Sequence, residues 1–216
     1  MKSIYCISGL GADQRIFQKI SIEGFELKPV PWPPVDMHDD MACYAQKIIA
    51  AIPDPNPIVM GVSFGGMLTV ELAKQIPVTK AILVSSVKRR SELPPFSGFV
   101  QWLAQSNILP IGMMKHIHSP VYKQFGVTSE DGKKLLGQIL NDTDGKFVRW
   151  ALNALSRWQN ETVPEHVFHI NGDADKVIPP DLVKPDYWVK GGTHFMIYER
   201  AAEVSAAITT QLKQEH

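Results

Sequence analysis

The chain has 216 residues, of which 44% are hydrophobic and 20% charged. This length and composition fit one globular domain and exclude a disordered chain. The 22 Lys and Arg residues balance 22 Asp and Glu residues, so bulk charge predicts neither a nucleic-acid nor a membrane partner. Apolar runs stay below the roughly 18 residues of a membrane helix. Two cysteines exclude a disulfide framework and make the cytoplasm the expected compartment.

In the first half of the chain, short apolar runs alternate with runs of helical spacing. The expected strands are residues 3–7, 25–30, 58–60 and 81–84, and the expected helices are residues 13–20, 38–52 and 64–75. The run 81–84 is apolar on both faces, as a covered parallel strand should be. The alternation resumes with strands 167–170 and 187–189 and a helix over 195–212. We therefore predict an α/β fold with an open, mostly parallel sheet of about six strands and helices on both faces.

A Gly-x-Ser-x-Gly motif lies between the third expected strand and the helix that follows it. It reads Gly61-Val62-Ser63-Phe64-Gly65. In this context the motif is typical of a nucleophile elbow, a turn so sharp that only small neighbours fit around the serine. The turn would lift the Ser63 hydroxyl above the sheet, at a helix N-terminus that favours negative charge. The alternative is a glycine-rich turn without chemical use.

A serine nucleophile needs a general base and an acid that orients the base, and in this architecture the acid comes first along the chain. His194 follows the last expected strand in the sequence Gly191-Gly192-Thr193-His194 and is the candidate base. The preceding strand-end loop contains two acids, Asp173 and Asp175. We favour Asp175, deeper in the loop, because Asp173 directly follows Gly172 and is placed to shape the turn by binding backbone N–H groups.

The loop after the first strand, Ser8-Gly9-Leu10-Gly11, is the candidate partner of the elbow. Acyl transfer needs two N–H donors for the oxyanion. We assign these to the backbone N–H groups of Phe64 and Leu10, with Gly9 letting the backbone approach the substrate. The glycines could also simply permit a tight strand-to-helix turn, and both interpretations can hold together.

Residues 88–162 break the strand–helix rhythm and contain helical runs at 96–103, 133–140 and 147–158. We predict a helical insertion over one edge of the sheet, inside a single domain that spans residues 1–216. Most of its apolar side chains should pack onto the sheet, while Trp102, Met113 and Met114 are candidates for lining an apolar pocket above Ser63. The basic run 88–90 is interpreted as a solvated hinge in preference to the alternative, an anion site for a phosphate-bearing substrate.

Together these segments resemble the α/β-hydrolase fold superfamily, specifically the small cytosolic serine hydrolases with a helical cap. The resemblance implies the order serine, acid, histidine, which corresponds to Ser63, Asp175 and His194. It also makes residues 88–162 the cap. Two departures stand out: Ser8-Gly9 replaces the His-Gly found in many members, and the chain starts at what would be the third strand of the family.

The function expected from the sequence is a serine hydrolase that cleaves a small, largely apolar carboxylic ester or thioester through an acyl-enzyme. The same triad could support acyl transfer, carbon–carbon bond hydrolysis, cyanohydrin cleavage or cofactor-free peroxidation, and a silent small-ligand receptor is a further alternative. No cofactor is expected, because no nucleotide-binding loop is present. No metal site is expected either, since His116 and His118 have no carboxylate or cysteine cluster nearby. The sequence leaves the oligomeric state open.

Overall fold

The structure, a computed structural model, describes residues 1–94 and 118–214. In this part of the chain the strands are β1 (Lys2–Ile7), β2 (Phe25–Pro29), β3 (Ile58–Val62), β4 (Lys80–Val84), β5 (Val167–Gly172) and β6 (Tyr187–Val189). The helices are the 3-10 turns η1 (Gln14–Phe17) and η2 (Arg90–Glu92) and the α-helices α1 (Met41–Ile49), α2 (Phe64–Ala73), α5 (His118–Phe125), α6 (Glu130–Asp142), α7 (Gly145–Arg157), α8 (Met196–Glu199) and α9 (Ala201–Lys213). None of the helices within residues 1–94 and 118–214 combines the length and the apolar character needed to cross a membrane.

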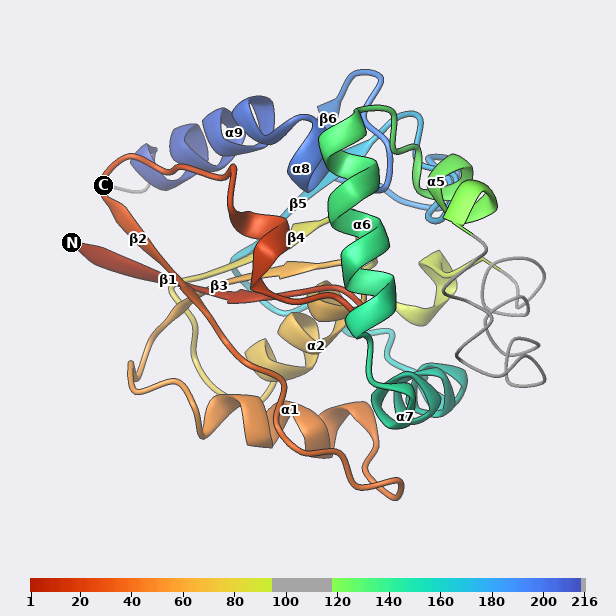
Figure 1. The fold of residues 1–216 in the computed structure, drawn as a ribbon. Coiled ribbons are helices and arrows are strands. Elements are labelled where there is room, and N and C mark those ends of the chain that lie inside the picture. Colours follow the sequence, from red (N-terminus) through yellow and green to blue (C-terminus); the bar gives the residue numbers. More distant parts are fainter. Residues whose placement is uncertain (95–117, 215–216) are drawn as a thin grey trace.

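The described strands form one open sheet in the order β2-β1-β3-β4-β5-β6, and every neighbouring pair is parallel (Figure 1). This confirms the predicted six-stranded architecture. Because all strands run the same way, the loops after β1, β3, β5 and β6 leave the sheet at the same edge. These loops carry the residues singled out from the sequence.

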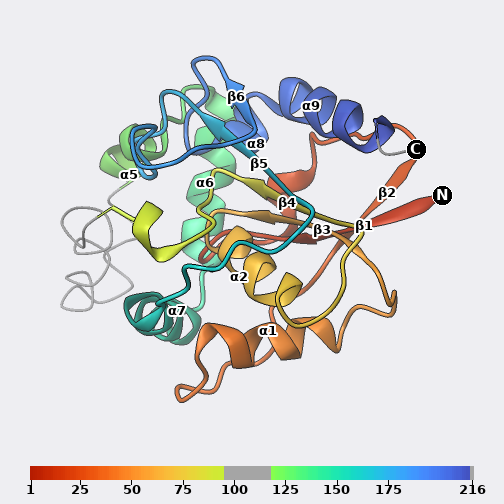
Figure 2. The same cartoon turned by 180° about the vertical axis from the view of Figure 1, so that it is seen from behind.

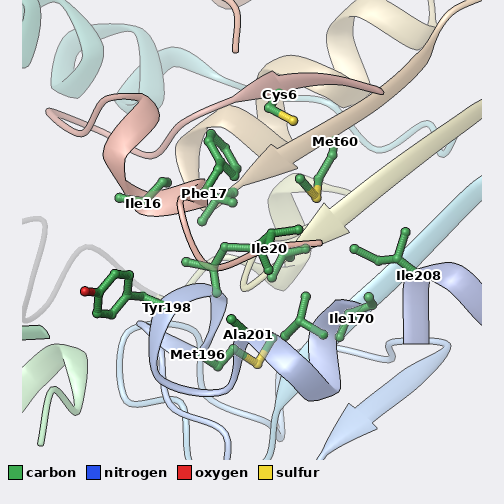
Figure 3. Packing of buried hydrophobic residues seen from close by; sticks show 14 of the residues in the cluster. Cys6, Ile16, Phe17, Ile20, Met60, Ile170, Met196, Tyr198, Ala201 and Ile208 are labelled. Atoms are coloured by element: carbon green, nitrogen blue, oxygen red, sulfur yellow. The ribbon is translucent and has the colours of Figure 1, made fainter. Parts of the chain in front are cut away.

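The strands bury both of their faces, and successive side chains alternate between the two. On one face, Ile4 and Cys6 of β1 pack in a cluster with η1, α8 and α9, part of which is seen in Figure 3. On the other face, Tyr5 and Ile7 of the same strand pack in a cluster with α1, α2 and α7. Continuous apolar strands therefore reflect a sheet covered on both sides, as predicted for 81–84.

In the described part of the predicted insertion, the 3-10 turn η2 is followed by the α-helices α5, α6 and α7. In both views of the fold these three helices lie toward the side opposite the two chain termini, where the strands end (Figures 1 and 2). Helix α6 begins after Ser129, whose side chain accepts a hydrogen bond from the Gly132 N–H, and α7 begins after Asp144, which caps it in the same way. The helices expected at 133–140 and 147–158 are thus present, whereas the one expected at 96–103 lies outside the described residues.

Two sequence-based expectations about helices need correction. The helix expected at 13–20 is only the short 3-10 turn η1, which begins after Asp13. The single helix expected over 195–212 is divided into α8 and α9, because Arg200 has φ −125° and ψ 34° and leaves the helical conformation. The Glu199 carboxylate beside this break accepts hydrogen bonds from the hydroxyls of Thr128 (2.9 Å) and Ser129 (2.6 Å). A tertiary contact thus accompanies a break that helical periodicity does not reveal.

Candidate active site

Ser63 occupies a strained turn between β3 and α2. Its φ of 53° and ψ of −119° lie in a region that residues with a side chain rarely adopt. A Cβ atom added at Gly61 would overlap the Gly65 carbonyl and the Thr69 hydroxyl, and one added at Gly65 would overlap the carbonyls of Ser8 and Ile7. The two glycines of the motif are therefore steric requirements of this turn. Ser63 itself is half-buried.

The turn is held by hydrogen bonds to the Ser63 backbone. The Ser63 N–H donates to the Val84 carbonyl of β4 (2.9 Å). The Ser63 carbonyl accepts from the Gly66 N–H (2.9 Å) and from the Ser86 hydroxyl (2.7 Å). Ser86 was not singled out from the sequence. Its position just after β4, the neighbour of β3, is the only signal that could have identified it.

The structure brings Ser63, His194 and Asp175 into one hydrogen-bonded chain. The Ser63 Oγ lies 3.0 Å from the His194 Nε2, and the His194 Nδ1 lies 2.8 Å from the Asp175 Oδ2. His194 and Asp175 are only 4% and 3% exposed. Buried from water, the carboxylate and the ring stay in one relative orientation, which leaves the Nε2 facing the serine hydroxyl.

The two candidate acids have different environments. The second oxygen of Asp175, Oδ1, accepts the backbone N–H groups of Val177 (2.8 Å) and Ile178 (2.9 Å), so both carboxylate oxygens are engaged. Asp173 is exposed and accepts the Gly191 N–H at 2.5 Å. Asp173 thus joins the acid loop to the histidine loop, and Asp175 is the carboxylate that reaches His194.

The loop after β1 lies directly beside the elbow. A Cβ atom at Gly9 would be 3.5 Å from the Cβ of Ser63, which places Gly9 and the following Leu10 at the nucleophile. The Ala12 N–H donates to the Gly9 carbonyl (2.9 Å) and closes a turn around Leu10 and Gly11. Phe64, the second expected donor, is the first residue of α2 and its side chain is buried. Both N–H groups assigned to the oxyanion therefore belong to segments that border Ser63.

Helix α5 reaches the histidine loop, a contact that sequence reasoning missed. The Phe125 ring meets the His194 ring nearly edge-to-face, with centroids 5.2 Å apart. The Phe125 carbonyl accepts the Phe195 N–H (3.1 Å), and the Gly126 carbonyl accepts the Thr193 hydroxyl (3.1 Å). The His194 loop is therefore packed between the sheet edge and α5. Of the residues expected to contact the substrate, Gly9 is at the site, while Trp102, Met113 and Met114 lie outside the described residues.

A surface cavity of about 380 Å³ lies elsewhere, between α1, α2, α7 and the segment after α7. Its lining includes Glu71, Lys74 and Trp158, and none of Ser63, Asp175 and His194. The Glu71 carboxylate there is already bound by Lys74 (2.9 Å) and by the Trp158 indole N–H (2.7 Å).

Across residues 1–94 and 118–214, no three His, Cys, Asp or Glu side chains come together as a metal site would require.

Comparison with known proteins places this geometry in a family. Residues 8–207 match the model of the alpha/beta hydrolase family. The chain belongs to the alpha/beta hydrolase family. The matched residues include the loop after β1, the elbow, the acid loop and the histidine loop, so every segment of the site lies within the match. A sequence search of curated proteins gives no match.

Solved structures similar to this chain share its fold at low sequence identity. A bromoperoxidase from Bacillus anthracis superposes with a TM-score of 0.76 at 15% identity, over 98% of this chain and 92% of the other. The N-acyl homoserine lactonase AidH, solved with N-butanoyl homoserine, gives 0.75 at 17% identity, over 99% and 89%. A thermophilic esterase from Thermogutta terrifontis gives 0.70 at 12% identity, over 100% and 91%. At these identities the similarity shows the fold alone.

Proposed function

We propose that this hydrolase cleaves small, largely apolar carboxylic esters or thioesters through an acyl-enzyme on Ser63. The single observation that carries the proposal is the hydrogen-bonded chain from the Ser63 Oγ through both ring nitrogens of His194 to Asp175. A serine hydroxyl is a weak nucleophile, and this arrangement is the one that activates it.

In the acylation step, the Ser63 Oγ attacks the substrate carbonyl carbon while its proton passes to the His194 Nε2. The carbonyl oxygen becomes an oxyanion, which accepts the N–H groups of Phe64 and Leu10. When the tetrahedral intermediate collapses, the bond from the carbonyl carbon to the leaving oxygen or sulfur breaks. His194 returns the proton to the leaving group, and the acyl group stays on Ser63.

Deacylation repeats these steps with water as the nucleophile, which gives its proton to His194 and releases the carboxylic acid. Throughout, Asp175 accepts the Nδ1–H and so keeps the Nε2 lone pair directed at Ser63. The N–H groups of Val177 and Ile178 hold the carboxylate in place. The half-burial of Ser63, beside a fully buried acid and base, supports a small-molecule substrate that enters from one side.

The test is hydrolysis of p-nitrophenyl esters from acetate to decanoate by the wild type and by Ser63→Ala, together with labelling by a fluorophosphonate. We expect labelling of Ser63 and a loss of at least about a thousandfold in kcat on removal of the hydroxyl. The acyl-chain length of the ester with the highest kcat/KM would give the size of the acyl pocket. A wild type that is labelled but turns over no ester would contradict ester hydrolysis and favour transferase or lyase chemistry. A folded wild type that resists the probe would instead fit a silent receptor.

A further inference from the structure

The loop that carries the Leu10 N–H is held from outside the triad. We propose that Ser8 and Trp32 are positioning residues of the oxyanion site, which act by binding the Ala12 carbonyl together and thereby aim the Leu10 N–H at the developing oxyanion. This inference rests on the proposed function, because an oxyanion forms only if Ser63 attacks a carbonyl.

The turn itself leaves the Leu10 N–H free for a substrate. Its closing hydrogen bond joins the Ala12 N–H to the Gly9 carbonyl, and its third residue, Gly11, has φ +70°. A positive φ at this position is what a type II turn requires. This hydrogen bond joins the N–H of the fourth residue of the turn, Ala12, to the carbonyl of the first, Gly9. The N–H of the second residue, Leu10, takes no part in it.

Two side chains converge on the last residue of the turn. The Ser8 hydroxyl donates to the Ala12 carbonyl at 2.9 Å, and the Trp32 indole N–H donates to the same carbonyl at 2.8 Å. A carbonyl oxygen has two lone pairs, so both donors can bind at once. With the Ala12 N–H bound to Gly9, both backbone groups of Ala12 are occupied.

Trp32 is itself held in place. It follows β2 within a Pro31-Trp32-Pro33-Pro34 sequence, whose prolines restrict the backbone. Its ring lies 4.6 Å from the Phe147 ring of α7 and 6.4 Å from the Phe64 ring of α2, centroid to centroid. Because these contacts hold the Trp32 ring in place, its hydrogen bond to the Ala12 carbonyl supports the loop rigidly.

Ser8 stands where many members of the family have histidine, and the structure shows what the serine contributes. Its side chain is 4% exposed, and its hydroxyl donates across the turn to Ala12. An oxyanion donor must lie about 2.7–3.1 Å from the oxygen, so a small displacement of the turn removes its effect. Ser8 and Trp32 contribute to that precision at Ala12, while the Thr143 hydroxyl binds the neighbouring Gly11 carbonyl (2.9 Å). Either Ser8 or Trp32 alone would leave one lone pair of the Ala12 carbonyl without a protein donor.

The experiment compares Trp32→Phe and Ser8→Ala with the wild type. Trp32→Phe retains an aromatic ring and removes the N–H. Trp158→Phe is the matched control, because its indole N–H donates to Glu71 in the remote cavity. The measurements are kcat and KM for a p-nitrophenyl ester, Ki for an alkyl trifluoromethyl ketone, the rate of fluorophosphonate labelling and Tm.

We expect kcat to fall about tenfold in Trp32→Phe and in Ser8→Ala, with KM within about twofold, and the double variant to lose more. The Ki of the ketone, which forms an oxyanion on Ser63, should rise in proportion to the loss in kcat. A merely structural role would lower Tm without this proportionality. Wild-type values of kcat and Ki in Trp32→Phe, or losses equal to those in Trp158→Phe, would overturn the inference while the proposed function stands. A wild type that neither hydrolyses the ester nor is labelled would overturn both.

Discussion

Replacing Asp175 by Asn tests which acid serves His194 and why. The Asn side chain has one oxygen, and the loop presents two backbone donors, the N–H groups of Val177 and Ile178, at 2.8 and 2.9 Å from the present Oδ1. If the amide oxygen binds these donors, the amide NH₂ faces the His194 Nδ1. The ring must then carry its proton on Nε2, and Nε2 can no longer accept the proton of Ser63.

The opposite orientation of the Asn side chain is too costly to rescue activity. It would place the NH₂ against the two backbone N–H groups and leave both without an acceptor, at a cost of about 3 kcal/mol, so only about 1% of molecules would adopt it. The amide also gives less stabilisation to the imidazolium that forms during acylation. We therefore expect kcat to fall by about 10³–10⁴-fold, with a folded protein and little change in KM.

The assay is p-nitrophenyl ester hydrolysis and fluorophosphonate labelling, with Asp173→Asn as the matched control. The Asp173 variant keeps an oxygen for the Gly191 N–H and should stay within about threefold of the wild type. Circular dichroism and Tm would verify that both variants fold. Activity of Asp175→Asn within tenfold of the wild type, with a large loss in Asp173→Asn, would refute this reasoning and make Asp173 the acid.

Three further predictions concern the scaffold. His169 on β5 is fully buried, and burial, with a smaller contribution from the Lys88 cation, lowers its pKa to about 4. The folded state therefore resists protonation of His169, and the free energy of unfolding should fall by about 2 kcal/mol as the pH is lowered from 7 to 4.5. The stabilisation is fully present above about pH 6.5 and is lost as the pH falls toward 4. Urea unfolding of His169→Gln should lack this part of the pH dependence. A Cβ at Gly61 would overlap the Gly65 carbonyl, so Gly61→Ala should lower Tm by several degrees and abolish labelling of Ser63; unchanged labelling would contradict a steric role. Ser86→Ala removes the hydroxyl that binds the Ser63 carbonyl and should lower kcat about fivefold. An equal kcat in the variant and the wild type would disprove this.

The fold was predictable because its signals are local. Runs such as 81–84 identify buried strands, and helical spacing identifies α1, α6 and α7, since each of these patterns depends on residues close together in the sequence. The prediction failed where a helix break lies beside a tertiary contact. The helix expected over 195–212 breaks at Arg200, next to a Glu199 carboxylate bound by Thr128 and Ser129. Nothing in the local sequence indicates that these hydroxyls approach Glu199.

The candidate site likewise has features that the sequence predicts and features that depend on the tertiary structure. The sequence by itself determined the elbow around Ser63, because the two glycines that the turn requires are visible as a motif. A Cβ at Gly61 would overlap the Gly65 carbonyl, and one at Gly65 would overlap the carbonyls of Ser8 and Ile7. Only the tertiary structure decided between Asp173 and Asp175, since the distance to His194 depends on how two strand-end loops pack. It also brought His194 to Ser63 across 131 residues, and the Trp32 indole to the Ala12 carbonyl across 20. Contacts of this kind arise when parallel strands end at one sheet edge, and no spacing in the sequence contains that geometry.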